Sequence, residues 1–136
     1  MKRLGIILAT VIVGLVGGLC AGRWLAAQPA GLTQTMLMRA HLAGIEGREA
    51  VMGLAEIAPG AAAGRHVHAS VELGYVLAGT AILEVEGDEA VMLQAGDAYV
   101  IDAGRVHEAK AVGASPAKVL AVWIVEKGQP LATPVP

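Results

Sequence analysis

From residue 35 onward the apolar runs of this chain are short, and each ends at a group of turn residues. Glycine recurs in those breaks, as at 44–47, 79 and 103–104. The spacing predicts strands at 35–41, 49–57, 65–68, 72–78, 80–86, 90–93, 98–101, 106–111 and 118–126. No stretch after residue 34 keeps a helical period over three turns. The pattern therefore predicts an all-β sandwich or barrel.

The first 27 residues have a different character. Lys2 and Arg3 precede an uncharged apolar stretch at 4–22, and the small and polar residues Ala26, Ala27 and Gln28 come before Pro29. This order is typical of a secretory signal peptide, with cleavage expected after Ala27. The alternative is an uncleaved membrane-anchor helix, because 19 apolar residues nearly span a bilayer. The first alternative predicts a periplasmic or secreted domain, and the second a domain anchored outside the cytoplasm.

The rest of the chain has the length of one domain. We divide it into a linker and first strand at 28–48, a barrel at 49–127 and an extended tail at 128–136, with the linker itself at 28–33. The whole chain has 10 basic and 12 acidic residues, and three of the basic ones, but no acid, precede residue 28. The formal charge of the rest is therefore 7 − 12 = −5, which argues against a nucleic-acid partner. The only cysteine is Cys20, so the rest of the chain has no disulfide.

Four side chains have the types and the spacing of metal ligands. His66 and His68 are two residues apart, so on a strand both imidazoles face the same side. Glu72 follows on the same parity, and His107 lies on a separate predicted strand that a barrel can bring alongside. Three imidazoles and one carboxylate suit Mn, Fe(II), Co, Ni, Cu or Zn rather than Ca or Mg. We expect one such divalent ion, with open positions for a ligand.

The segments around these residues resemble the two sequence motifs of the cupin family. The first motif, G-x5-H-x-H-x3,4-E-x6-G, is matched at every position, by Gly60, His66, His68, Glu72 and Gly79. The second motif, G-x5-P-x-G-x2-H-x3-N, is matched by Gly96, Gly104 and His107, with Asp102 for the proline and Ala111 for the asparagine. Asp102 is expected to add a carboxylate near the mouth of the site.

The resemblance implies a cupin double-stranded β-helix, or jelly-roll barrel, over about residues 50–126, with one metal ion on the four ligands. The motifs are similar to those of quercetin-type dioxygenases, which implies a metal-dependent dioxygenase or related oxidoreductase acting on a small organic molecule. Glu72 would be the general base if it left the metal. The alternatives are a non-catalytic module that holds a small ligand or the metal, and a cupin isomerase or lyase, so whether the chain is an enzyme stays open. Because cupins often pair through edge strands, we expect a homodimer.

Seven other side chains near the motifs are candidates for a pocket wall: Met52, Arg65, Tyr75, Met92, Tyr99, Glu108 and Trp123. We expect them to pack in the core rather than to contact a substrate. Arg65 should point away from His66, because neighbours on a strand face opposite sides. His41 lies outside both motifs and is expected to be an ordinary strand or surface histidine. A pocket with few polar groups beyond the ligands favours a small or apolar substrate.

Overall fold

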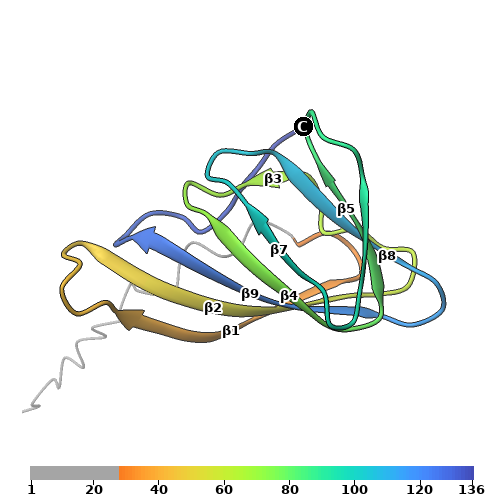
Figure 1. Ribbon diagram of the computed structural model, residues 1–136, viewed down its shortest axis with the longest axis horizontal. Coiled ribbons are helices and arrows are strands. Elements are labelled where there is room, and N and C mark those ends of the chain that lie inside the picture. Colours follow the sequence, from red (N-terminus) through yellow and green to blue (C-terminus); the bar gives the residue numbers. More distant parts are fainter. Residues whose placement is uncertain (1–27) are drawn as a thin grey trace, which may run out of the picture.

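The computed structural model describes residues 28–136, and every regular element in that range is a β-strand (Figure 1). In chain order the strands are β1 Leu32–His41, β2 Arg48–Ile57, β3 His66–Val67, β4 Glu72–Ala78, β5 Thr80–Val85, β6 Val91–Gln94, β7 Ala98–Ile101, β8 His107–Val112, β9 Ala117–Glu126 and β10 Thr133–Pro134. The predicted all-β class is confirmed. The signal or anchor segment predicted at 1–27 lies outside the described residues. Within the described range no helix has the length and apolar character needed to span a membrane.

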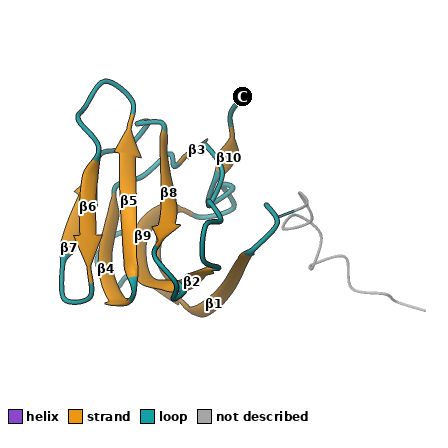
Figure 2. Cartoon of the chain, turned by 90° about the vertical axis from the view of Figure 1, so that its right-hand side faces the viewer, coloured by secondary structure: helices purple, strands orange, loops and turns teal. Residues whose placement is uncertain are grey.

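The strands form two five-stranded antiparallel sheets. One has the order β1-β2-β9-β4-β7 and the other β10-β3-β8-β5-β6. In Figure 1 the long strands β1, β2, β9 and β4 run side by side, and Figure 2 shows β6, β5 and β8 of the second sheet beside one another. The chain passes repeatedly from one sheet to the other, as in a jelly roll.

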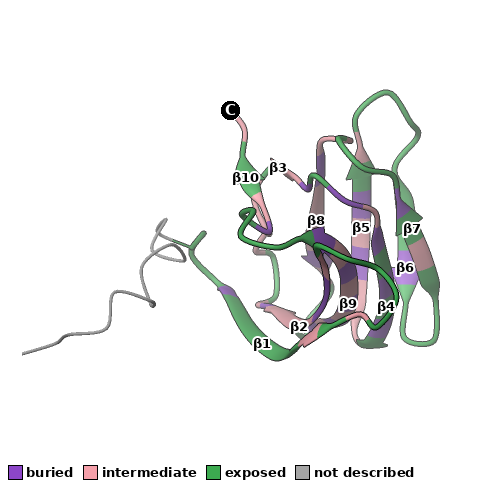
Figure 3. Ribbon diagram, turned by 90° about the vertical axis from the view of Figure 1, so that its left-hand side faces the viewer, coloured by how far each residue is buried: buried purple, intermediate pink, exposed green. Residues whose placement is uncertain are grey.

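Burial alternates along the strands with the period of two that the sequence pattern predicts. In β4, Val76 is fully buried, whereas its neighbours Tyr75 and Leu77 are exposed. Along β9 every second residue from Ala117 to Val125 is buried. These inward side chains form the core between the sheets, while β1 is mostly exposed (Figure 3). The alternation fixes which residues of each strand can reach the interior.

Two segments are more ordered than the sequence pattern predicts. Strand β1 begins at Leu32, inside the expected linker, because Leu32 is buried and pairs with Ile57 of β2. In the tail, β10 pairs with β3. Pro134 is tolerated there because β10 is an edge strand. The tail thus closes one edge of the second sheet, next to His66.

The turn after β4 requires glycine. Gly79 has a φ of 74°, a conformation that other residues rarely adopt. A Cβ at this position would also collide with the backbone carbonyl of Pro116. This agrees with the expectation that Gly79 marks a point where the chain reverses into the next strand.

Candidate metal centre

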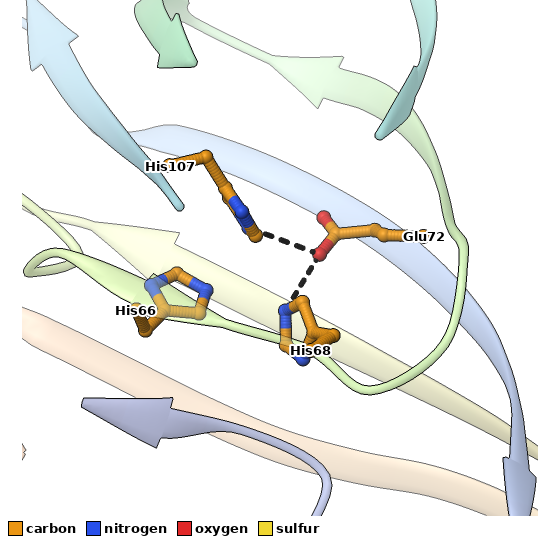
Figure 4. A group of neighbouring side chains, drawn as sticks. All are labelled: His66, His68, Glu72 and His107. Atoms are coloured by element: carbon orange, nitrogen blue, oxygen red, sulfur yellow. Dashed lines mark ion pairs between the residues drawn. The ribbon is translucent and has the colours of Figure 1, made fainter. Parts of the chain in front are cut away.

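The four predicted ligands converge between the two sheets. His66 of β3 and His107 of β8 are in register on neighbouring strands of the second sheet. Glu72 is the first residue of β4 in the first sheet, and His68 lies in the connection between β3 and β4. One donor atom from each residue lies within 4.8 Å of all the others (Figure 4). We call His66, His68, Glu72 and His107 the His–Glu cluster.

The route to this convergence differs from the predicted one. The sequence pattern placed His66 and His68 on one strand and Glu72 at the start of the next, with all three side chains expected on the same side because they share parity. In the structure β3 ends at Val67, and the chain then crosses to the other sheet before Glu72. The crossing brings the carboxylate to the histidines from the opposite wall, so the cluster joins the two sheets.

Backbone carbonyls orient all three imidazoles. The Nδ1 atoms of His66, His68 and His107 lie 2.7, 2.6 and 2.9 Å from the carbonyl oxygens of Gly64, Leu131 and Arg105 respectively. A carbonyl only accepts, so each Nδ1 must carry the proton and donate it. In the neutral imidazole this leaves a lone pair on every Nε2. Such an arrangement is typical of histidines that bind a metal ion.

The Nε2 of His68 lacks a hydrogen-bond partner. This atom is buried and lies 2.8 Å from Oε2 of Glu72. The Nε2 of His107 lies 3.5 Å from the same oxygen. A buried nitrogen lone pair that faces a carboxylate is unfavourable unless a proton or a metal ion lies between the two atoms. The donor set of three nitrogens and one oxygen therefore fits a divalent transition-metal ion.

Burial and mutual contact shift the pKa values in the cluster. Burial would raise the pKa of Glu72, but contacts with His107 and His68 outweigh it and hold that pKa well below the usual range. Burial lowers the pKa of His66. Burial would also lower the pKa of His107, but the contact with Glu72 outweighs it and raises that pKa. Glu72 is therefore ionised at neutral pH, and a proton on His107 competes with a cation for its charge.

Two aromatic side chains hold the Glu72 carboxylate. Tyr99 Oη donates to Oε1 at 2.8 Å, and Trp123 Nε1 donates to Oε2 at 3.1 Å. Burial and the nearby Glu72 charge raise the pKa of Tyr99, so its hydroxyl stays protonated. Gly74 makes room for this contact: it is in register with Tyr99, and a Cβ at residue 74 would collide with the Tyr99 ring.

A cavity of about 260 Å³ lies beside the cluster, and all four cluster residues line it. Its wall is mainly apolar, and small side chains provide much of the room: Gly53, Ala55, Ala63, Ala109, Ala121 and Ala132. The cavity therefore combines a polar donor set with an apolar interior. This arrangement is typical of a small-molecule site.

Of the seven candidates for a pocket wall, Tyr99 and Trp123 line the cavity. Both pack in the core as expected, and both also hold Glu72, a role that the sequence pattern did not reveal. The other five are not part of the wall. The expectation of core packing is wrong for three of them: Tyr75 and Met92 are exposed, and Arg65 pairs with Glu86 at the surface. Met52 is half-buried on β2, and Glu108 lies near Lys110. His41 is exposed on β1, as expected.

The two departures from the second motif are accommodated by the fold. Asp102 is exposed in the turn between β7 and β8 and does not line the cavity. The expectation of an added carboxylate near the mouth of the site is therefore wrong. Ala111 is buried with Leu32 and Ala117 in the core, where an apolar residue is suitable. The sequence pattern also did not reveal the backbone carbonyls of Gly64, Arg105 and Leu131 that orient the imidazoles, because a backbone group leaves no signal in the residue type.

Comparison with known proteins gives a family match and several structural neighbours. A family model described as Cupin domain matches residues 53–123. The fold is similar to that of the DMSP lyase DddQ from Ruegeria pomeroyi DSS-3, with a TM-score of 0.64 and 19% identity over 76% of this chain and 51% of that chain. It is also similar to TT1209 from Thermus thermophilus, with a TM-score of 0.57 and 29% identity over 70% of this chain and 84% of that chain.

A third neighbour is the polyketide cyclase RemF from Streptomyces resistomycificus, with a TM-score of 0.61 and 21% identity over 79% of this chain and 72% of that chain. The chain spans about half the length of the DMSP lyases. Comparison with the curated proteins gives no match. At 19% and 21% identity, the likeness to the lyase and to the cyclase shows the fold alone.

Proposed function

The chain belongs to the cupin family, and on this basis we propose that it is a metal-dependent enzyme acting on a small organic molecule. The His–Glu cluster would hold one divalent transition-metal ion, and the cavity beside it would hold the substrate. The observation that carries the proposal is the common orientation of the three imidazoles. Each donates Nδ1–H to a backbone carbonyl, which leaves Nε2 free for an ion near Glu72.

The donor set favours Mn, Fe, Co, Ni, Cu or Zn. When bound, such an ion supplies a Lewis acid that polarises an oxygen of the substrate, and a redox-active ion also supplies electrons for oxygen chemistry. The chain's own residues have three tasks. The carbonyls of Gly64, Arg105 and Leu131 orient the histidines, Tyr99 and Trp123 hold Glu72, and the apolar wall excludes water.

The role of Glu72 as a general base remains a prediction. Both of its carboxylate oxygens accept a hydrogen bond from an aromatic side chain. These two bonds favour a fixed ligand over a carboxylate that leaves the ion. A base that acts only after dissociation would first have to break them.

We propose that the reaction is an oxygen-dependent oxidation of the dioxygenase type. The support is a donor set that suits Fe, Cu or Mn together with an apolar cavity. Two further functions remain alternatives. The neighbours named as a lyase and a cyclase show that this fold also carries non-oxidative chemistry, and a cupin can hold a ligand without turnover.

One experiment separates these functions. The protein is loaded in turn with Fe²⁺, Mn²⁺, Cu²⁺, Ni²⁺ and Zn²⁺, and oxygen uptake is measured on a panel of catechols and flavonols. Oxygen uptake that requires the metal is the expected result. Metal-dependent product without oxygen would instead identify a lyase or isomerase. Metal and ligand binding with no product in any combination would leave a binding module.

We propose that the domain works outside the cytoplasm, as a periplasmic or secreted protein. The support comes from the order of charge, apolar stretch and small residues in 1–27. Intact-mass measurement of the chain recovered from cells distinguishes the two forms of export. A mass that begins at Gln28 indicates a cleaved signal peptide, and a full-length mass in the membrane fraction indicates an anchor.

We also propose a homodimer, formed through the outer face of β9, β4 and β7. Two rows of apolar side chains cross these strands in register: Val122, Leu73 and Val100 in one, and Leu120, Tyr75 and Ala98 in the other. We call these six residues the outer apolar face. Leu73, Tyr75 and Val100 are 50%, 45% and 62% exposed, so the face is uncovered in the single chain.

Paired charged residues lie at two ends of this face. On the same side of β2 and β9, the ion pair of Arg48 with Glu126 lies at one end and that of Glu56 with Lys118 at the other. An apolar centre with a polar rim is typical of protein interfaces. Two copies of such a face can meet without burying an unpaired charge, which supports a second copy of this chain as the partner.

A further inference from the structure

The cavity wall offers no charged partner outside the His–Glu cluster. Among the described residues that line it, none is Lys, Arg or Asp, and Glu72 is the sole glutamate. The charged side chains nearest in sequence are at the surface, where Arg65 pairs with Glu86 and Arg105 with Asp88. Tyr99 and Trp123 are neutral and donate to Glu72, and the remaining polar side chains of the wall, Gln28, Gln34 and Thr35, are neutral and exposed. A charged group of a ligand can therefore be neutralised only at the cluster.

The charge of the cluster limits the ligand further. This step rests on the proposed function, because it counts the bound divalent ion. Three neutral imidazoles and one carboxylate leave such an ion with one uncompensated positive charge. A buried charge in apolar surroundings is strongly unfavourable unless it is paired. One negative charge on the ligand balances the site, whereas a second would lie unpaired against the apolar wall.

The position of the small side chains shows where the rest of the ligand fits. On β2, Val51 is level with Trp123 and the cluster, Gly53 lies against the Trp123 ring, and Ala55 follows farther along the strand. On β8, Ala109 follows His107 on the same face. These positions leave room beyond the cluster, and Leu83 and Val119 add apolar surface there. The room is thus continuous with the cluster and lined by hydrocarbon.

We propose that the site binds a monoanion with a single oxyanion head, such as a carboxylate or enolate, and a hydrocarbon remainder. The head lies at the His–Glu cluster and the remainder fills the space made by Ala55 and Ala109. Molecules with a second charged group are excluded. Ala55 is a specificity-determining residue, because it limits the length of the remainder without touching the cluster.

The test uses the full protein loaded with Co²⁺ and titrated with hexanoate, adipate and acetate. Binding is measured by calorimetry and by the visible spectrum of Co²⁺, neither of which requires turnover. Hexanoate and adipate have the same chain length but one and two carboxylates. We expect hexanoate to bind at least about ten-fold more tightly than adipate.

The variant Ala55→Leu tests the position of the hydrocarbon. It should weaken hexanoate at least about ten-fold and leave acetate unchanged, because acetate reaches only the cluster. Ala43→Leu, in the exposed connection between β1 and β2, is the control and should change neither. Adipate binding as tightly as hexanoate, or hexanoate binding unchanged in Ala55→Leu, would overturn the inference while the metal site stands. A protein that takes up no Co²⁺ would overturn the proposed function itself, and the inference with it.

Discussion

Glu72 is the residue that connects the donor set to the surrounding core. Its carboxylate faces the histidines of the cluster, and each of its oxygens also accepts a hydrogen bond from an aromatic side chain. A carboxylate held at both oxygens presents one orientation to an ion. The affinity of the cluster for a metal therefore depends on residues that do not themselves belong to it.

The hydroxyl of Tyr99 can be removed with little change in the shape of the side chain. The variant Tyr99→Phe should weaken metal binding about 10-fold to 100-fold, because Glu72 loses the hydrogen bond to Oε1. Titration with Zn²⁺ by calorimetry measures the change. Tyr75→Phe on β4 is the matched control, since Tyr75 is exposed and does not line the cavity. Equal affinity in Tyr99→Phe and the wild type would show that the hydrogen bond does not position the ligand.

The pairing of strand β4 with strand β7 places Tyr99 next to Glu72 of the His–Glu cluster. Gly74 lies opposite Tyr99 in this pair, and the ring occupies the space that a Cβ would take. Replacing Gly74 by alanine should therefore displace the ring. We expect a loss of stability of about 1–3 kcal/mol from the crowding, together with weaker metal binding.

A double-mutant cycle separates crowding from other effects of Gly74→Ala. In a Tyr99→Ala background the ring is gone, so the added methyl should have little further effect on stability or metal affinity. Thermal unfolding and Zn²⁺ titration are measured for the wild type, for each single variant and for the double variant. They give the coupling free energy between the two changes, once for stability and once for metal binding. Additive effects of the two changes would contradict the assignment of Gly74 as the space for Tyr99.

The sequence predicts most elements because alternation of apolar residues and glycine turns are local signals. The bounds of β4 and β7 agree with the prediction, and the other predicted strands differ by a few residues. Strand β10 was missed, since two residues with a proline carry no strand pattern, and only the pairing with β3 defines them. The start of β1 was missed because its burial depends on Ile57, a distant residue.

The candidate site was predictable to a similar extent. The spacing of histidines and glutamate identifies the cluster, because side-chain donors are visible in the residue types. The carbonyl that fixes His68 comes from Leu131, 63 residues away, and no residue type encodes it. Tyr99 and Trp123 resemble ordinary core residues in the sequence. Their contacts with Glu72 depend on the register of β4 with β7 and β9, which only the folded sheet defines.

For the molecule as a whole, the outer apolar face predicts the oligomeric state. We expect light scattering to give the mass of two chains for the wild type and one chain for Val100→Glu, because the new charge would be buried unpaired in the dimer. Met92→Glu is the control, since Met92 is 59% exposed on β6 of the other sheet. A single-chain mass for the wild type, or a two-chain mass for Val100→Glu, would contradict this interface.

The function proposed for this molecule depends on His66, His68, Glu72 and His107 together holding one metal ion. Elemental analysis of protein loaded with Zn²⁺ and then dialysed measures this binding without any substrate. We expect one ion per chain in the wild type and in His41→Ala, whose histidine is exposed and outside the cluster. We expect loss of the ion in His66→Ala and in His107→Ala, with the fold retained by circular dichroism. Equal metal content in the wild type and these two variants would refute the metal site.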